Sequence, residues 1–192
     1  LINKIIKKAN FDIAVMINGK DLLKYNKNNI NSIFIKKKLS KIKYIRIACH
    51  FNEVKLIVPV SKLLKRLGYS LIINFMGTGL RTDKELRDIT KIIDKSKVFD
   101  VIYFADSFGN MLPEDVERKY IIIKKIWKKD IGFHAHNNFG LALANAIKAM
   151  QIGPDLKIYI AKTGLQLAVI RDPNLQGTAC NLVDSGPVIP TG

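Results

Sequence analysis

Five short runs of the chain are almost continuously apolar, and each of them ends in polar residues. They cover residues 11–17, 44–49, 69–76, 100–105 and 131–133, the last of which leads into two histidines. Strands buried on both faces have this pattern, because strict alternation is expected only where one face meets water. The pattern therefore predicts five buried strands.

The segments between these runs carry apolar residues at helical spacing. A helix is predicted over residues 52–67, with Asn52 as its cap and Pro59 causing a kink or a late start. Thr82–Glu85 has the spacing of a capping box, and Pro113 suits the first turn of a further helix. The apolar faces of the later helices comprise Leu86, Ile89 and Ile93; Val116, Tyr120, Ile123 and Trp127; and, over residues 140–150, Leu143, Ile147 and Met150.

Strands and helices thus alternate along the chain, with one weakly periodic helical patch at residues 30–39. This order predicts an α/β fold with a parallel sheet. A TIM (β/α)8 barrel gathers functional residues from the carboxyl ends of several strands, whereas a doubly wound sheet binds its ligand in one crevice. No Gly-x-Gly-x-x-Gly or P-loop motif favours the second fold. Polar residues follow at least four of the predicted strands, which favours a barrel: His50, Asn74, Asp106, Ser107, His134, His136 and Asn138.

The segment 132–140 holds two of the three histidines of the chain, one residue apart. On a strand, residues two apart point to the same face, so His134 and His136 are predicted to lie side by side. Two adjacent imidazoles can bind a divalent metal ion. Such a pair also occurs as ordinary core or surface residues, and the spacing alone leaves both interpretations open.

The formal net charge of +16 raises the possibility of nucleic-acid binding. The lysines, however, are spread over every predicted helix, without a basic stripe interleaved with aromatic residues. A run such as residues 36–38 is most simply a solvated face, so we expect no nucleic-acid partner. No run approaches the roughly 18 apolar residues of a membrane span. Two cysteines are too few for a disulfide framework, and a cytoplasmic location is expected.

The charge is confined to the first part of the chain. Residues 154–192 contain three basic and three acidic residues, so the excess of +16 lies within residues 1–153. This shift predicts a boundary near Gly153, with one domain over residues 1–153 and a divergent tail over residues 154–192.

Four segments resemble one enzyme family. They are Ile-Arg-Ile-Ala-Cys-His50, Asn74-Phe-Met76, Tyr-Phe-Ala-Asp-Ser-Phe-Gly-Asn-Met-Leu-Pro-Glu-Asp-Val116 and Gly-Phe-His-Ala-His-Asn-Asn-Phe-Gly-Leu-Ala-Leu-Ala-Asn-Ala-Ile147. They are similar to the HMG-CoA lyase-like metal-dependent aldolases, also called the pyruvate carboxyltransferase or DRE-TIM family, and within it to 4-hydroxy-2-oxovalerate aldolases. The resemblance spans about residues 11–153 and implies a TIM barrel that binds Mn²⁺ or Mg²⁺.

In this family the metal is held by both histidines of the His-x-His strand and by an Asp on the first strand. A 2-oxo acid such as pyruvate chelates the metal, which acts as a Lewis acid and stabilises the enolate. By position, His134 and His136 match the metal ligands. Ser107 and Asp106 match residues near the substrate carboxylate, and His50 and Asn74 match residues that line the pocket. For Asp106 a loop-anchoring role, and for His50 a structural role at the barrel end, remain alternatives, and Asn145 is expected to be structural.

The chain departs from the family at both ends. The Asp-Arg-Asp/Glu-Gly motif of the first strand, which supplies the Asp ligand and the catalytic Arg, does not occur, and the sequence begins near the third strand. The Gly-rich loop expected after Gly153 does not occur either. We therefore expect a partial barrel of about five βα units, explained by a frameshift, fusion or truncation, with weak or no catalysis by itself.

Three functions follow from the resemblance. The first is a metal-dependent lyase that cleaves a 4-hydroxy-2-oxo acid to pyruvate and an aldehyde. The second is a Claisen-type acyltransferase of the same family, like 2-isopropylmalate or homocitrate synthase. The third is a non-catalytic fragment. The expected partner is a small 2-oxo acid, with a protein partner or a homo-oligomer in the intact parent, and neither nucleic acid nor a membrane.

Overall fold

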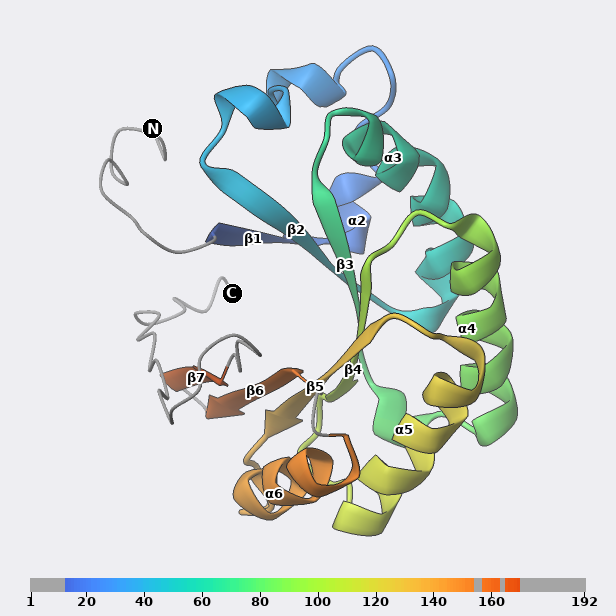
Figure 1. The fold of residues 1–192 in the computed structure, drawn as a ribbon, viewed down its shortest axis with the longest axis vertical. Coiled ribbons are helices and arrows are strands. Elements are labelled where there is room, and N and C mark those ends of the chain that lie inside the picture. Colours follow the sequence, from blue (N-terminus) through green and yellow to red (C-terminus); the bar gives the residue numbers. More distant parts are fainter. Residues whose placement is uncertain (1–12, 154–156, 163–164, 170–192) are drawn as a thin grey trace. The chain divides into compact units, whose positions relative to one another are not determined.

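The computed structural model describes residues 13–153, 157–162 and 165–169. Strands and helices alternate, and the hydrogen-bonded order of the strands follows their order in the chain, from β1 to β7 (Figure 1). The described residues divide into two compact units. One contains the residues up to Phe75 together with Ile89–Ile102, and the other contains Met76–Asp88 and the residues from Tyr103 onward.

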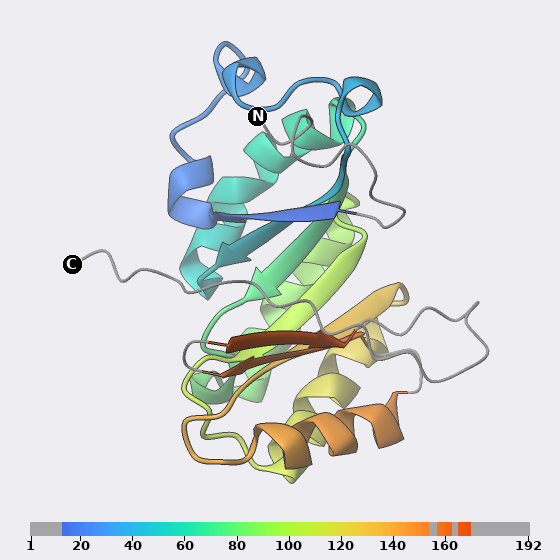
Figure 2. The ribbon, with the colours of Figure 1, turned by 90° about the vertical axis from the view of Figure 1, so that its left-hand side faces the viewer.

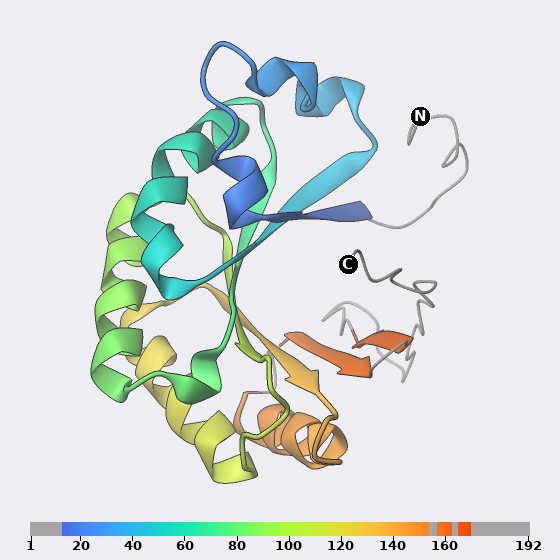
Figure 3. The same cartoon turned by 180° about the vertical axis from the view of Figure 1, so that it is seen from behind.

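The first unit is built on three parallel strands. They are β1 (Ile13–Asn18), β2 (Ile42–Cys49) and β3 (Ser70–Phe75), with the short α2 (Gly19–Leu22) and the longer α3 (Val54–Arg66) packed against them (Figure 3). Their inward side chains have no solvent exposure and form the core: Ile45, Ile47, Ile57, Leu64, Leu71 and Ile73. The three strands predicted from the apolar runs are confirmed as strands, although residues 11 and 12 of the first run lie outside the described residues. The prediction that the first of them is buried is wrong, because the side chains of β1 alternate between half-buried and exposed, with Met16 59% exposed.

Two further local predictions in this unit are wrong. Asn52 does not cap α3; a 3-10 turn over Phe51–Glu53 precedes the helix, and the Glu53 carboxylate accepts the backbone N–H of His50 at 2.9 Å. Glu53 satisfies this donor because it reaches back three residues from a buried position. Residues 30–39 form only two 3-10 turns, Ile30–Ser32 and Lys37–Leu39, because their weak apolar period does not support a longer helix.

Helix α4 (Asp83–Ser96) and strand β4 (Val101–Asp106) each contribute residues to both units. The capping box predicted for α4 is confirmed. The backbone N–H of Thr82 donates to the Glu85 carboxylate at 2.8 Å, and the backbone N–H of Glu85 donates to the Thr82 hydroxyl at 3.2 Å. All six residues of β4 are buried, as expected for a strand covered on both faces.

The second unit contains α5 (Pro113–Ile126), β5 (Asp130–His136), α6 (Ala142–Ile152), β6 (Lys157–Lys162) and β7 (Leu165–Val169). Strand β5 pairs with β6 in parallel, and β6 pairs with β7 antiparallel (Figure 2). The domain boundary at Gly153 and the divergent tail after it stay predictions. Residues 154–156, 163–164 and 170–192 of that tail lie outside the described residues.

The helices of this unit bury faces that differ in part from the predicted ones. In α5, Pro113 opens the helix as predicted and Tyr120 is only half-buried, while Lys119 is 1% exposed. In α6 the predicted apolar face is exposed, and small residues form the buried side: Ala142, Asn145, Ala146 and Ala149. Small side chains allow α6 to approach α5 and β5 closely, and this outweighs the greater hydrophobicity of the larger residues. None of the helices in the described part of the chain is long and apolar enough to cross a membrane.

Candidate metal and substrate site

The end of β5 presents the two histidines as a stacked pair. The ring centroids of His134 and His136 are 4.7 Å apart, with an angle of 11° between the ring planes. His134 is 9% exposed and His136 is half-buried. The prediction that both imidazoles share a face of the strand is confirmed.

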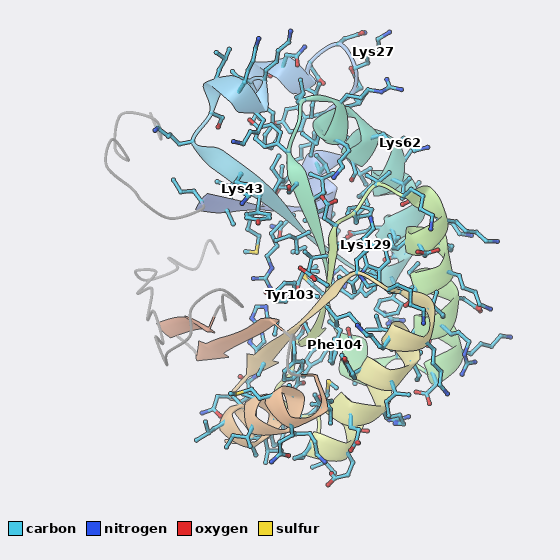
Figure 4. The ribbon with its side chains drawn as sticks, in the orientation of Figure 1. Lys27, Lys43, Lys62, Tyr103, Phe104 and Lys129 are labelled. Atoms are coloured by element: carbon cyan, nitrogen blue, oxygen red, sulfur yellow. The ribbon has the colours of Figure 1, made fainter. Side chains whose placement is uncertain are left out.

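Gly132 allows an aromatic ring to lie beneath this pair. A Cβ atom on Gly132 would lie 2.3 Å from Cζ of Tyr103 and within 2.5 Å of both Cε atoms, so the phenol ring of β4 occupies the space that a side chain would need. Because Gly132 and His134 are two residues apart in one strand, the Tyr103 ring lies on the histidine side of β5. Phe104, next to Tyr103 in β4 (both labelled in Figure 4), contacts Phe133 instead, with ring centroids 5.0 Å apart.

Asp106 ends β4 and is fully buried. Its carboxylate accepts the backbone N–H groups of Asn110 at 3.1 Å and Met111 at 3.2 Å. Burial raises the pKa of this carboxyl, while the backbone N–H groups and the nearby His136 act in the opposite direction. Both carboxylate oxygens are thus used to hold the loop after β4, which supports the loop-anchoring interpretation of Asp106.

Ser107 follows Asp106 and is half-buried. Its Oγ accepts the backbone N–H of Gly77 at 2.8 Å, so the β3–α4 connection is tied to the end of β4. A hydroxyl that accepts one hydrogen bond can still donate its own hydrogen. Ser107 therefore has a donor suited to a carboxylate oxygen.

His50 and Asn74 belong to the first unit, whereas Ser107, Asp106, His134 and His136 belong to the second. Asn74 is buried, and its Oδ1 accepts a hydrogen bond from Nη2 of Arg46 at 3.0 Å. His50 is exposed and directly follows β2. Sequence reasoning did not single out Arg46 or Tyr103. The available signal was weak, because both strands also contain other polar or aromatic residues.

The histidine pair fits part of a divalent-metal site. Imidazole nitrogens bind most divalent transition metals, whereas Mn²⁺ and Mg²⁺ prefer oxygen donors for the greater part of their coordination. Among the described residues, no group of three or more His, Cys, Asp or Glu side chains is arranged to hold a metal ion. The two histidines therefore offer two nitrogen donors, fewer than such a site needs.

Lysines are distributed over many elements rather than gathered on one. Those labelled in Figure 4 come from four places: Lys27 follows α2, Lys43 lies in β2, Lys62 in α3 and Lys129 between α5 and β5. This distribution agrees with the interpretation of the charge as solvated faces.

Comparison with known proteins identifies the family. The HMGL-like family model matches residues 3–157. A 4-hydroxy-2-oxovalerate aldolase from Geobacillus genomosp. 3 is 38% identical over 112 residues, which is 58% of this chain and 33% of the relative. The enzyme of the same name from Chloroflexus aurantiacus is 33% identical over 114 residues, covering 59% of this chain and 33% of the relative. The chain thus spans about a third of the length of these curated relatives.

Solved structures confirm the fold. The N-terminal domain of a protein described as an aldolase from Bacteroides vulgatus superposes with a TM-score of 0.70 at 26% identity, covering 85% of this chain and 52% of that one. The carboxyl transferase domain of Rhizobium etli pyruvate carboxylase gives a TM-score of 0.65 at 16% identity, covering 81% of this chain and 27% of that one. The second likeness shows the fold alone, that of part of a TIM barrel. Because the family model covers most of its length, this chain belongs to the HMGL-like family.

Proposed function

We propose that this chain is part of a metal-dependent carbon–carbon lyase that cleaves a 4-hydroxy-2-oxo acid to pyruvate and an aldehyde. The observation that carries the proposal is the stacked pair His134 and His136 at the end of a barrel strand. The names of the relatives support a lyase rather than a Claisen-type condensation.

The proposed metal ligands are His134 and His136, and the proposed ion is Mn²⁺ or Mg²⁺. When bound, the cation supplies a Lewis acid that stabilises negative charge on the 2-oxo group as the carbon–carbon bond breaks. The hydroxyl of Ser107 donates a hydrogen bond to the substrate carboxylate. His134 is largely buried, and burial strengthens electrostatic interactions at its ring.

His50 and Asn74 match, by position, residues of the family that line the substrate pocket, and these two assignments stay predictions. Within the first unit, Arg46 holds the Asn74 amide through Oδ1. This bond fixes which way the amide points, so the NH₂ group of Asn74 is presented as the donor. Asp106 is proposed to act through the loop that it anchors rather than by touching the substrate.

Two imidazoles alone bind a hard cation weakly. We therefore propose that this chain binds the metal and the 2-oxo acid together. A chelating 2-oxo acid supplies oxygen donors, so each of the two ligands strengthens the binding of the other.

Isothermal titration calorimetry tests this proposal. Oxalate, a non-reactive mimic of the chelating 2-oxo acid, is titrated into the chain with and without Mn²⁺, and the titration is repeated with H134A/H136A. We expect oxalate binding that requires Mn²⁺ and disappears in the double variant. Acetyl-CoA is added in a separate titration, and binding that depends on it indicates the Claisen-type activity instead. Oxalate binding that is unchanged by removing Mn²⁺ or both histidines contradicts the proposal.

A further inference from the structure

We propose that the loop over residues 107–111, called here the β4 loop, is a positioning element that sets where His136 lies, and that Gly109 is its point of contact with β5. This inference rests on the proposed function in so far as His136 is a metal ligand. Gly109 is a positioning residue, because it contacts the backbone around His136 and not a substrate or metal.

The base of the β4 loop is held by Asp106. The carboxylate accepts the backbone N–H groups of Asn110 and Met111, and the Asp106 carbonyl accepts the N–H of Gly109 at 3.1 Å. Three consecutive loop residues are therefore bonded to one fully buried residue. A carboxylate that accepts backbone N–H groups forms strong, charge-assisted hydrogen bonds, so the base of the loop has little freedom.

Two further bonds tie the flanks of the β4 loop. The fully buried Asn145 of α6 donates from Nδ2 to the carbonyl of Met111 at 2.8 Å. At the other end, Ser107 accepts the backbone N–H of Gly77. The β4 loop is thus fixed from β4, from α6 and from the β3–α4 connection, and it cannot move aside without breaking one of these bonds.

Gly109 lies directly against the segment that follows the second histidine. Its φ is +66°, and a Cβ atom there would lie 2.7 Å from the backbone nitrogen of Asn138 and 3.0 Å from the carbonyl oxygen of His136. These contacts are with backbone atoms, which cannot rotate away as a flexible side chain does. Because the β4 loop is held on three sides, an added methyl group pushes the end of β5, and with it the imidazole of His136.

Small displacements are sufficient to disturb a metal site. Productive geometry at such sites is held within about 0.5 Å, and changes to residues that orient a ligand typically lower metal affinity about 10- to 100-fold. The β4 loop therefore fixes the position of His136 relative to His134.

The test compares G109A with a matched control, G140A. Both glycines have positive φ, +66° at Gly109 and +77° at Gly140, so both substitutions introduce the same kind of left-handed backbone strain. A Cβ on Gly140 meets nothing within 4 Å, whereas one on Gly109 meets the backbone of His136 and Asn138. The two variants therefore separate strain from displacement.

The first readout is the ¹H–¹⁵N spectrum of the imidazoles in the metal-free chain. We expect the His136 resonances to shift in G109A and to keep their wild-type positions in G140A. The second readout is Mn²⁺ affinity, expected to fall about tenfold or more in G109A and to stay near wild type in G140A. Wild-type imidazole spectra in G109A, or equal changes in the two variants, overturn the proposal.

The metal-free spectrum keeps this inference separate from the proposed function. If the wild-type chain does not bind Mn²⁺, the proposed function fails, while the imidazole shift still decides the positioning role. A second variant, N145A, removes the hydrogen bond from α6 to the Met111 carbonyl, and it neither adds an atom next to β5 nor changes a charge near His136. If G109A does not fold, N145A is expected to shift the His136 resonances in the same spectrum, and an unshifted spectrum overturns the proposal.

Discussion

Replacing Gly132 by Ala tests the packing beneath the histidine pair. The new Cβ would lie between 2.3 and 2.5 Å from three ring atoms of Tyr103, about 1 Å closer than an ordinary contact of about 3.5 Å. Either the ring or β5 must therefore move by about 1 Å. Neither movement is easy, because Tyr103 is 7% exposed and Phe133, the next residue of β5, is fully buried.

Overpacking of this size in a core costs about 1–3 kcal/mol. An alanine in a strand otherwise gains up to about 1 kcal/mol over glycine, because the unfolded chain loses conformational freedom. We expect a net loss of about 1–2 kcal/mol in the free energy of unfolding. Equilibrium urea unfolding, followed by far-UV circular dichroism, measures this loss.

A double-mutant cycle assigns the loss to the contact. The change Tyr103→Ala removes the ring, so G132A is expected to cost much less in the Y103A background than in wild type. The coupling between the two changes should exceed about 1 kcal/mol, as is usual for residues in direct contact. Additive effects, or a G132A chain as stable as wild type, would refute the proposed packing.

Three further changes have defined outcomes. Lys119→Ala removes a buried ammonium bonded to the carbonyl of Arg81 and to Asp83, and it should lower the free energy of unfolding by about 1–3 kcal/mol. The control Lys124→Ala, at an exposed position, should change the free energy of unfolding by less than about 0.5 kcal/mol in the same urea assay. Slight burial acts to raise the pKa of the Asp83 carboxyl, but the bonds of this carboxyl to Lys119 and Arg118 hold its pKa below 3.8. The stability that these bonds contribute is complete above pH 3.8 and is lost at more acid pH, so Asp83→Asn should weaken the acid dependence of unfolding in that range. Burial raises the pKa of the Cys49 thiol, so with the second cysteine replaced by serine the native chain should not react with Ellman's reagent until urea unfolds it, and rapid native labelling would contradict its buried position.

The strands and the histidine geometry were predictable because each depends on local pattern. Continuous apolar runs identified β1 to β5, and the i, i+2 relation alone placed His134 and His136 on one face. The capping box at Thr82 was predictable for the same reason, since both of its hydrogen bonds lie within four residues.

Features that depend on the tertiary neighbours were not predictable. In α6, two stripes of residues have helical spacing, and only the close approach of the neighbouring elements selects the alanine stripe over Leu143, Ile147 and Met150. The buried Lys119 shows the same point, because its partners lie more than 30 residues away in sequence. Tyr103 and Gly132 are complementary only because β4 and β5 bring them together.

The site was predictable to a different degree for each residue. The resemblance indicated which residues carry the chemistry, but not that both oxygens of Asp106 are bonded to backbone N–H groups of the β4 loop. Residue type sets how many hydrogen bonds a side chain can make, whereas the folded loop decides which of them form. The same holds for Arg46, whose partner Asn74 lies on a neighbouring strand.

The central claim is that His134 and His136 bind one divalent metal ion together. Electron spin-echo envelope modulation of Mn²⁺ added to the chain measures this directly, because it detects the nitrogen nuclei bound to the ion. We predict coupling to two imidazole nitrogens in the wild-type chain, to one in H134A and in H136A, and to none in the double variant. Bound Mn²⁺ without nitrogen coupling, or with coupling unchanged in the double variant, would contradict the claim.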